Sequence, residues 1–67
     1  MEKFDAVYAA HFQAVYRFLL GLCRSAPLAE ELCQEAFVQA MIHWRDFRGD
    51  CAVEAWLCAI AKRLYFS

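Results

Sequence analysis

The stretch Ala29–Trp44, AEELCQEAFVQAMIHW, decides the fold that we predict for this chain. Its apolar residues recur every three or four positions, which is the spacing of one face of an α-helix. Off this apolar stripe stand Glu31, Gln34 and Glu35, whose spacing places them together on the helix surface. The stretch therefore predicts a core helix that offers a polar cluster to solvent, an arrangement typical of a docking surface. The predicted inward-facing residues are Leu28, Leu32, Cys33, Ala36, Phe37, Ala40, Met41 and Trp44.

A helix is predicted on each side of this stretch. The same apolar spacing begins at Phe4 and continues to Leu22, through Val7, Tyr8, Phe12, Val15 and Leu19. Between these two helices, Ser25 is expected to cap the second one, with Pro27 in its first turn. The third helix is predicted to begin with Asp50 as its N-cap. Its inward face comprises Val53, Trp56, Leu57, Ile60, Ala61 and Leu64.

No segment alternates between apolar and polar residues with a period of two, so the sequence predicts no strand. We therefore expect an all-α fold, a three-helix bundle with short loops. The chain has 67 residues, which is one domain at most. About 60% of the unfolded chain's surface is buried in a domain of this size. Since 63% of the residues are hydrophobic, some apolar side chains must lie on the surface, and such patches mark partner sites.

Charge, hydropathy and cysteine spacing limit the classes of protein to which the chain can belong. The net charge is −1, so bulk electrostatics do not indicate a polyanionic ligand. We find neither a signal peptide nor a membrane-spanning stretch, and expect a cytoplasmic protein without a membrane partner. The four cysteines never form a C-x-x-C pair, which predicts reduced thiols in the core or at an interface rather than a metal or disulfide framework. These cysteines are Cys23, Cys33, Cys51 and Cys58.

Residues for catalysis or cofactor binding do not gather into a recognisable set. The chain has only two glycines, Gly21 and Gly49, so it has no phosphate-binding glycine loop. Ser25 is assigned to capping, and Ser67 is terminal. A Cys–His pair could be formed from Cys33 or Cys51 with His11 or His43, but both cysteines are expected to be buried structural residues. We therefore expect neither an enzyme nor a bound cofactor or metal ion.

The order of the motifs resembles region 2 of a bacterial RNA polymerase sigma factor, of the small extracytoplasmic-function class. Three separated motifs appear in the family order over about Phe4 to Tyr65. The first motif is a pair of helices, FDAVYAAHFQAVYRFLLGLCRS followed by AEELCQEAFVQAMIHW. The second is the loop FRGD, and the third is the helix AWLCAIAKRL. The resemblance implies a domain that acts in transcription initiation by docking on core RNA polymerase and engaging promoter DNA.

The polymerase-binding pattern of the family, D-L-x-Q-E, corresponds here to residues 31–35, with Glu31 in place of the aspartate. The resemblance implies that Glu31, Gln34 and Glu35 dock on the clamp helices of the polymerase β′ subunit. Carboxylates on an exposed helix face can pair with arginines of a basic partner helix. The alternative is an ordinary solvated helix face.

The loop Phe47-Arg48-Gly49-Asp50 corresponds to the family loop that holds a base flipped out of the non-template strand of the minus-ten promoter element. A loop with an aromatic ring, an arginine and backbone donors can capture an unstacked base. The alternative, a plain connector capped by Asp50, is compatible with this role. Trp56 matches a family tryptophan, and because it falls on the apolar stripe we expect it to pack in the core; the alternative is that it stacks on a base.

Promoter contacts are also implied at the end of the third helix, where the family often has A-R-N and this chain has Ala61-Lys62-Arg63. Lys62 and Arg63 are expected to contact DNA, with Arg63 reaching phosphates. The chain stops before the family's second DNA-binding domain, so we expect residues 1–67 to be one region 2-like domain truncated at its C-terminus. The rival hypothesis is a helical protein-interaction module without DNA binding, which binds an anti-sigma factor or forms a homodimer through its exposed apolar surface.

Overall fold

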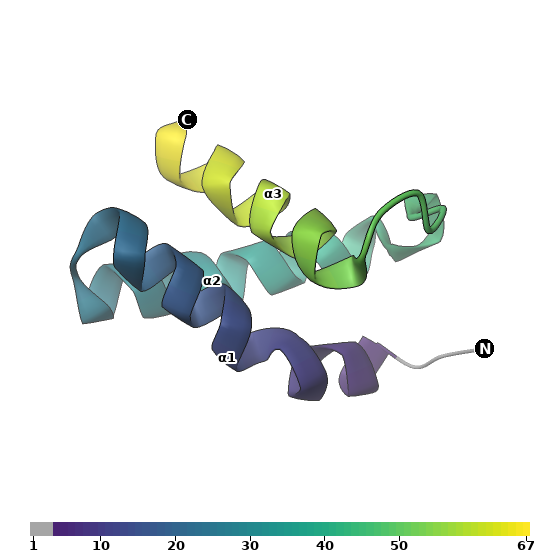
Figure 1. Ribbon diagram of the computed structural model, residues 1–67, viewed down its shortest axis with the longest axis horizontal. Coiled ribbons are helices and arrows are strands. Elements are labelled where there is room, and N and C mark those ends of the chain that lie inside the picture. The colour runs from purple at the N-terminus through teal and green to yellow at the C-terminus, as the bar shows by residue number, and fades with distance from the viewer. Residues whose placement is uncertain (1–3) are drawn as a thin grey trace.

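The computed structural model describes residues 4–67 and contains three α-helices (Figure 1). They are α1 (Phe4–Cys23), α2 (Ala26–Ile42) and α3 (Val53–Phe66), and a short 3₁₀ helix, η1 (Trp44–Asp46), follows α2. Figure 1 shows α2 returning alongside α1 and α3 crossing over this pair. Each helix packs against the other two. The described residues contain no strand, so the predicted all-α three-helix bundle is confirmed.

A tight turn joins α1 to α2. Arg24 has a φ of 58°, the left-handed conformation that commonly ends helices. Its amide donates to the carbonyl of Leu20 at 2.9 Å. Ser25 follows in an extended conformation, and its Oγ accepts a hydrogen bond from the amide of Leu28 at 3.4 Å. The predicted cap is thus confirmed, and Pro27 lies in the first turn of α2, where its missing amide hydrogen costs nothing.

The core follows the predicted apolar stripes at most positions. Alanines at three of the buried positions of α2 let the helices approach closely, while Leu19 and Leu57 are the largest fully buried side chains. None of the described residues that are buried is polar or charged. The buried residues are Val7, Val15, Leu19, Ala29, Cys33, Ala36, Phe37, Ala40, Leu57 and Ala61.

Tyr8, on the predicted stripe of α1, is 43% exposed, and two residues of α2 that were predicted to face the core also lie at the surface. Leu28 is 39% exposed and Met41 is 55% exposed, so the inward assignment was wrong for both. The reason is that α1 and α3 cover a band of α2 that is narrower than the predicted stripe. Both side chains therefore lie beyond the covered band.

The stretch Ala29–Trp44 is not helical to its end, because α2 stops at Ile42 and His43 caps it. Trp44 belongs to η1 and is only half-buried. Its indole packs edge-on against Phe4, with ring centroids 5.6 Å apart, and against Trp56 at 5.8 Å. Trp44 therefore closes the end of the bundle rather than extending the stripe of α2.

Asp50 does not cap α3, contrary to the prediction. The N-cap is Ala52, whose side chain can accept no hydrogen bond, and Asp50 lies two residues earlier in the exposed loop. The sequence rule selected the nearest residue with a capping side chain, whereas the loop needs two more residues to reach α3. The first turn of α3 therefore lacks the side-chain acceptor that Ser25 gives to α2.

We expect the substitution Ala52→Ser to stabilise the domain by about 1 kcal/mol, because a serine Oγ can accept a bond from an amide in the first turn of α3. The measurement is the free energy of unfolding from urea titration. Ala55→Ser is the matched control, since Ala55 is also exposed but lies inside α3. Equal effects of the two substitutions would contradict the capping argument.

No helix within residues 4–67 is long and apolar enough to cross a membrane.

Candidate functional site

The outer face of α2 is the first candidate surface. The structure places Glu31, Gln34 and Glu35 on it, all exposed, as the sequence predicted. Three apolar side chains of the same helix are exposed beside them, Val38 at 45%, Met41 at 55% and Ile42 at 63%. We use "outer face of α2" for these six residues. It has an acidic and polar half near the start of the helix and an apolar half near its end.

The acidic half of this face is free to bind a cation. Within residues 4–67 neither Glu31 nor Glu35 forms an ion pair. Among the described residues, the one side-chain hydrogen bond of Glu35 is that in which Gln39 Nε2 donates to its Oε2 at 3.3 Å. Beside Gln34, a shallow groove of about 280 Å³ runs between α1 and α2. It is lined by Phe4, Asp5, Tyr8, Gln34, Phe37, Val38 and Met41.

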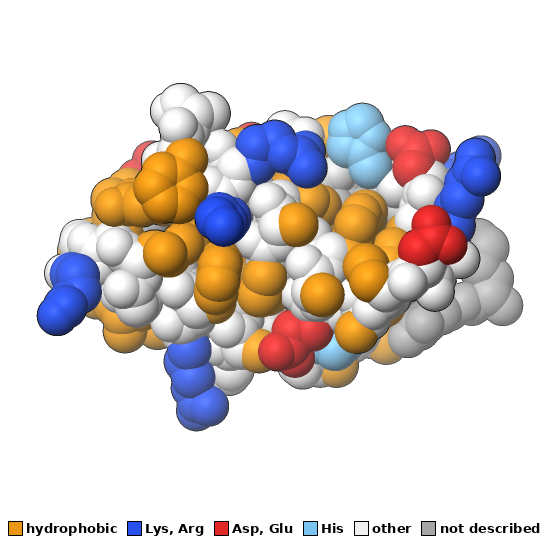
Figure 2. Space-filling model, turned by 45° about the horizontal axis from the view of Figure 1, so that its top comes forward, with side chains coloured by type: hydrophobic (Ala, Val, Ile, Leu, Met, Phe, Trp, Pro, Cys, Tyr) orange, Lys and Arg blue, Asp and Glu red, His pale blue; other side chains and the backbone are white. Residues whose placement is uncertain are grey.

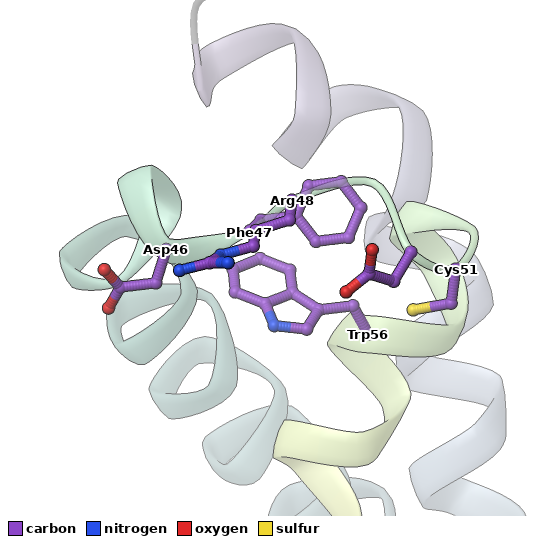
Figure 3. A pocket seen from close by; sticks show the side chains of 6 residues that line it. Asp46, Phe47, Arg48, Cys51 and Trp56 are labelled. Carbon is purple, nitrogen blue, oxygen red and sulfur yellow. The ribbon is translucent and has the colours of Figure 1, made fainter.

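A pocket of about 430 Å³ at the loop between η1 and α3 is the second candidate surface (Figure 3). We call it the loop pocket, and it is lined by Asp46, Phe47, Arg48, Asp50, Cys51 and Trp56. In Figure 3, Phe47 and Arg48 lie above the indole of Trp56, with Asp46 and Cys51 on opposite sides. The predicted loop residues thus meet Trp56, which sequence reasoning had assigned to the core.

Two aromatic rings, Phe47 and Trp56, line the loop pocket, and Trp44 packs against both. Phe47 stacks on Trp44 with centroids 5.6 Å apart and an interplanar angle of 9°, and its centroid is 5.0 Å from that of Trp56. Trp56 is half-buried, so it packs against the bundle and also borders the pocket. Gly49 does not line the pocket but has a φ of 78°, which glycine adopts without strain, and so permits the turn. Arg48 is exposed and forms no ion pair among the described residues.

A groove between α2 and α3 adjoins the loop pocket. We call it the α2–α3 groove; it measures about 230 Å³ and is lined by Gln39, His43, Asp46, Trp56, Ile60 and Arg63. Of the two cations of α3 predicted to contact DNA, the structure brings Arg63 into this groove, while Lys62 is exposed but lines neither it nor the loop pocket. Figure 2 shows Lys and Arg side chains scattered over the visible face of the molecule, with hydrophobic and acidic side chains between them.

A sequence model of the family described as Sigma-70 region 2 matches residues 7–66, almost the whole chain. The chain belongs to the sigma-70 region 2 family. The resemblance drawn from the motifs is therefore confirmed.

Two relatives from Bacillus subtilis (strain 168) support this assignment. The chain is 36% identical to the ECF RNA polymerase sigma factor SigM over 61 residues, which are 91% of this chain and 37% of SigM. It is 24% identical to the RNA polymerase sigma factor YlaC over 66 residues, 98% of this chain and 38% of YlaC. The similarity to SigM agrees with the extracytoplasmic-function class. The chain thus spans little more than a third of the length of either relative, and no solved structure matches it.

The cysteines of this sigma region 2 domain differ in burial. All four are free thiols; Cys33 is buried in α2, whereas Cys51 is exposed at the loop pocket, so the predicted burial of Cys51 was wrong. Both histidines lie beside carboxylates: His11 Nδ1 is 3.7 Å from Glu54, and His43 Nδ1 is 3.2 Å from Asp46. Residues 4–67 hold no cluster of three or more side chains arranged to bind a metal ion.

Burial makes Cys33 a weak acid in the folded domain. Loss of hydration, and secondly the neighbouring thiol of Cys58, raise the pKa of Cys33 from 9.0 to about 11. Burial, and secondly Glu54, also raise the pKa of Cys58. Since the folded-state pKa of Cys33 lies above its unfolded value, its contribution to stability is complete below pH 9.0 and is lost as the pH rises through about 11.

We therefore expect the domain to lose stability at alkaline pH partly through Cys33. Between pH 9.0 and about 11, the wild-type chain should lose about 2 kcal/mol more than Cys33→Ala, in which this titration is absent. The measurement is urea unfolding of both proteins across this pH range. Cys51→Ala is the control, because Cys51 is exposed and its removal should leave the pH dependence unchanged. Parallel pH curves for wild type and Cys33→Ala would contradict the prediction.

Proposed function

We propose that this domain docks on the β′ clamp helices of core RNA polymerase through the outer face of α2 and captures a base of the melted minus-ten element in the loop pocket. The observation that supports docking most directly is the exposure of Glu31, Gln34 and Glu35 on one helix face with no ion pair among the described residues. Their sequence pattern resembles the one that the family uses for this contact, with Glu31 in place of the aspartate.

The apolar half of the outer face of α2 supports the same role. Exposed Val38, Met41 and Ile42 extend the acidic cluster toward the end of the helix. A partner helix with arginines at one end and apolar side chains at the other would match both halves, since carboxylates bind arginine strongly and apolar burial supplies affinity. Clamp helices of such character are the partner that we infer.

Charge reversal tests the docking proposal. We expect Glu31→Lys and Glu35→Lys together to weaken binding of a β′ clamp-helix fragment by more than about tenfold, because removing one partner of an interfacial charge pair costs roughly 2–5 kcal/mol. The assay is a pull-down followed by titration. The double variant should keep the helical circular dichroism of the wild type, since both residues are exposed.

Glu30→Lys is the matched control for charge reversal. Glu30 is exposed on α2 outside the six residues of the outer face, and it lines a groove with Pro27 and Tyr16 beside the turn between α1 and α2. The Glu30→Lys variant should bind the β′ clamp-helix fragment nearly as well as wild type. Unchanged binding by the double variant would refute docking through the outer face of α2. Equal weakening by Glu30→Lys would show that the weaker binding results from the change in net charge and not from this face.

Base capture is supported by the construction of the loop pocket. Phe47, held between Trp44 and Trp56, presents aromatic surface to a ligand, and stacking on such surface contributes about 1–3 kcal/mol per base. Arg48, which has no ion pair within residues 4–67, adds a positive charge for the DNA backbone. We infer single-stranded DNA, the non-template strand, as the ligand, with an affinity that falls as salt concentration rises.

A second candidate function is protein interaction without DNA, with an anti-sigma factor or a second copy of the chain. Its support is the exposure of large apolar side chains on several helices, namely Tyr8, Leu28, Val38, Met41, Ile42 and Phe66. Sedimentation measurements and titration with single-stranded DNA separate the two candidates. A stable dimer with no salt-dependent DNA binding would favour the second.

A further inference from the structure

We propose that the pair His43–Asp46 is a pH-sensitive latch on the loop pocket: protonation of His43 tightens the pair and holds the aromatic rings beside the pocket in place. We use "latch" for these two side chains. The consequence for DNA rests on the proposed function, because it presupposes that the loop pocket binds a single strand. The latch itself is independent of that function, since it concerns contacts within the chain.

The latch joins the end of α2 to η1. His43 Nδ1 lies 3.2 Å from Asp46 Oδ2, and the amide of Asp46 donates to the carbonyl of His43 at 2.9 Å. In Figure 3 the carboxylate of Asp46 points away from the indole of Trp56, which leaves it to His43. The backbone bond does not depend on the charge of the imidazole, whereas the side-chain contact does. The side-chain contact is therefore the part that a change of pH alters.

Protonation of His43 strengthens the side-chain contact. A neutral imidazole donates from Nδ1 in only one of its two tautomers, whereas the protonated ring donates from both nitrogens. A hydrogen bond between oppositely charged groups is also stronger than one to a neutral donor. His43 caps the C-terminus of α2, where the helix dipole favours a cation. Because histidine side chains change charge between about pH 5 and 8, the latch tightens as the pH falls through this range.

Two cations adjoin the latch. Arg63 of α3 lines the same groove as His43 and Asp46, and Arg45 precedes Asp46 in η1. Both arginines are exposed and form no ion pair within residues 4–67, so water and salt screen their repulsion of a protonated imidazole. Asp46 is the one carboxylate among the described residues that line this groove. Since Asp46 is in direct contact with His43, its attraction decides the sign.

The latch is coupled to the loop pocket through η1. Trp44 and Asp46 both belong to η1, and Asp46 itself lines the pocket. The amide of Phe47 donates to the carbonyl of Trp44 at 3.2 Å, and their rings stack with centroids 5.6 Å apart. Trp56 packs against both rings. A looser latch therefore frees η1, and with it the stacked rings on which a base is expected to bind.

Tryptophan fluorescence tests the latch, because the two tryptophans of the chain, Trp44 and Trp56, pack against each other beside the pocket. The rate constant of quenching by acrylamide measures their exposure, without DNA, between pH 5 and 8. For wild type it should decrease as the pH falls. For His43→Gln it should not change with pH. In Asp46→Asn the imidazole still titrates but has no carboxylate partner, so quenching should again stay nearly constant.

His11→Gln is the matched control. His11 is the other histidine of the chain, and its Nδ1 lies 3.7 Å from Glu54, between α1 and α3. It lines neither the loop pocket nor the α2–α3 groove, so this variant should keep the pH dependence of wild type. Both latch residues are exposed, so their variants should keep the helical circular dichroism of wild type. Loss of the pH dependence in His11→Gln would assign it to the bundle as a whole and overturn the latch.

The second measurement is the affinity for single-stranded DNA, by fluorescence anisotropy at constant ionic strength. From pH 8 to pH 5 the affinity of wild type should rise about two- to fivefold more than that of Asp46→Asn, an effect of the size that an exposed pair at a helix end gives. The added charge on His43 is the same in both proteins, so the comparison removes the general effect of charge on DNA binding.

The outcomes distinguish the latch from the proposed function. Quenching of wild type that does not depend on pH, or that depends on it equally in Asp46→Asn, would overturn the latch and leave base capture intact. Equal rises of DNA affinity in both proteins would overturn the coupling of the latch to the ligand. Quenching as expected, without DNA binding at any pH, would support the latch and overturn base capture.

Discussion

The substitution Leu57→Ala is expected to leave most of the domain unfolded at room temperature. Leu57 is fully buried in α3 and is among the largest fully buried side chains of the described core. Replacing such a leucine by alanine costs about 2–5 kcal/mol, because the apolar contacts are lost and a cavity remains. A single hydrophobic core in a domain of 67 residues rarely supplies more than about 3–5 kcal/mol of net stability. The stability lost in Leu57→Ala is therefore comparable to the whole free energy of unfolding of the domain.

Circular dichroism and urea unfolding measure this effect. Leu28→Ala is the matched control, since it makes the same substitution at a leucine that is 39% exposed, and it should cost about 1 kcal/mol or less. If both variants unfold at the same urea concentration, the core does not depend on Leu57 in the way that the structure indicates. The same pair of variants tests whether Leu28 lies outside the core, as its exposure indicates.

The three helices could be predicted because apolar residues at helical spacing mark the face that each helix buries. Burial of these faces is what makes the helices pack. Val15, Leu19 and Leu57 fall on the predicted stripes and are fully buried. The turn at Ser25 was also predictable, since capping depends on residues that are close in sequence. In each of these cases, a rule about residues that are close in sequence describes a structure that those same residues form.

Features that depend on neighbouring helices were not predictable in the same way. Met41 satisfies the helical spacing of the stripe, yet it is exposed because no helix covers that side of α2. Asp50 has a good capping side chain, but the path of the loop decides which residue reaches α3, and that residue is Ala52. Sequence spacing shows on which face of its own helix a residue lies. It does not show how much of that face the neighbouring helices cover.

The candidate sites also divide into features of a single helix, which could be predicted, and features that join several segments, which could not. The exposure of Glu31, Gln34 and Glu35 followed from one helix, whereas the loop pocket requires Phe47 to meet tryptophans from two different segments. Val38 and Ile42 were missed as part of the outer face, although their spacing of four, just beyond Gln34, was a usable signal. The α2–α3 groove joins residues more than twenty positions apart, and nothing in the local sequence brings them together.

Trp56→Ala is expected to lower the affinity for single-stranded DNA by roughly 5- to 150-fold, which corresponds to the loss of one stacked base. Trp56 borders the loop pocket and supports Phe47 at a centroid distance of 5.0 Å, so its removal takes away aromatic surface and loosens the neighbouring ring. Trp56→Phe keeps an aromatic ring at this position and should retain most of the affinity. The measurement is anisotropy titration at low salt.

Trp56 also packs against Trp44, with centroids 5.8 Å apart, so lost affinity must be separated from lost folding. Phe66→Ala, at a residue that is 64% exposed near the end of α3, serves as the control for aromatic removal away from the pocket. Binding is compared only under urea-free conditions in which circular dichroism shows full helicity. Since the proposed polymerase contact uses α2 alone, a folded Trp56→Ala chain should still bind the clamp-helix fragment. A folded variant that binds DNA as tightly as wild type would rule out base capture at Trp56 and leave docking untouched.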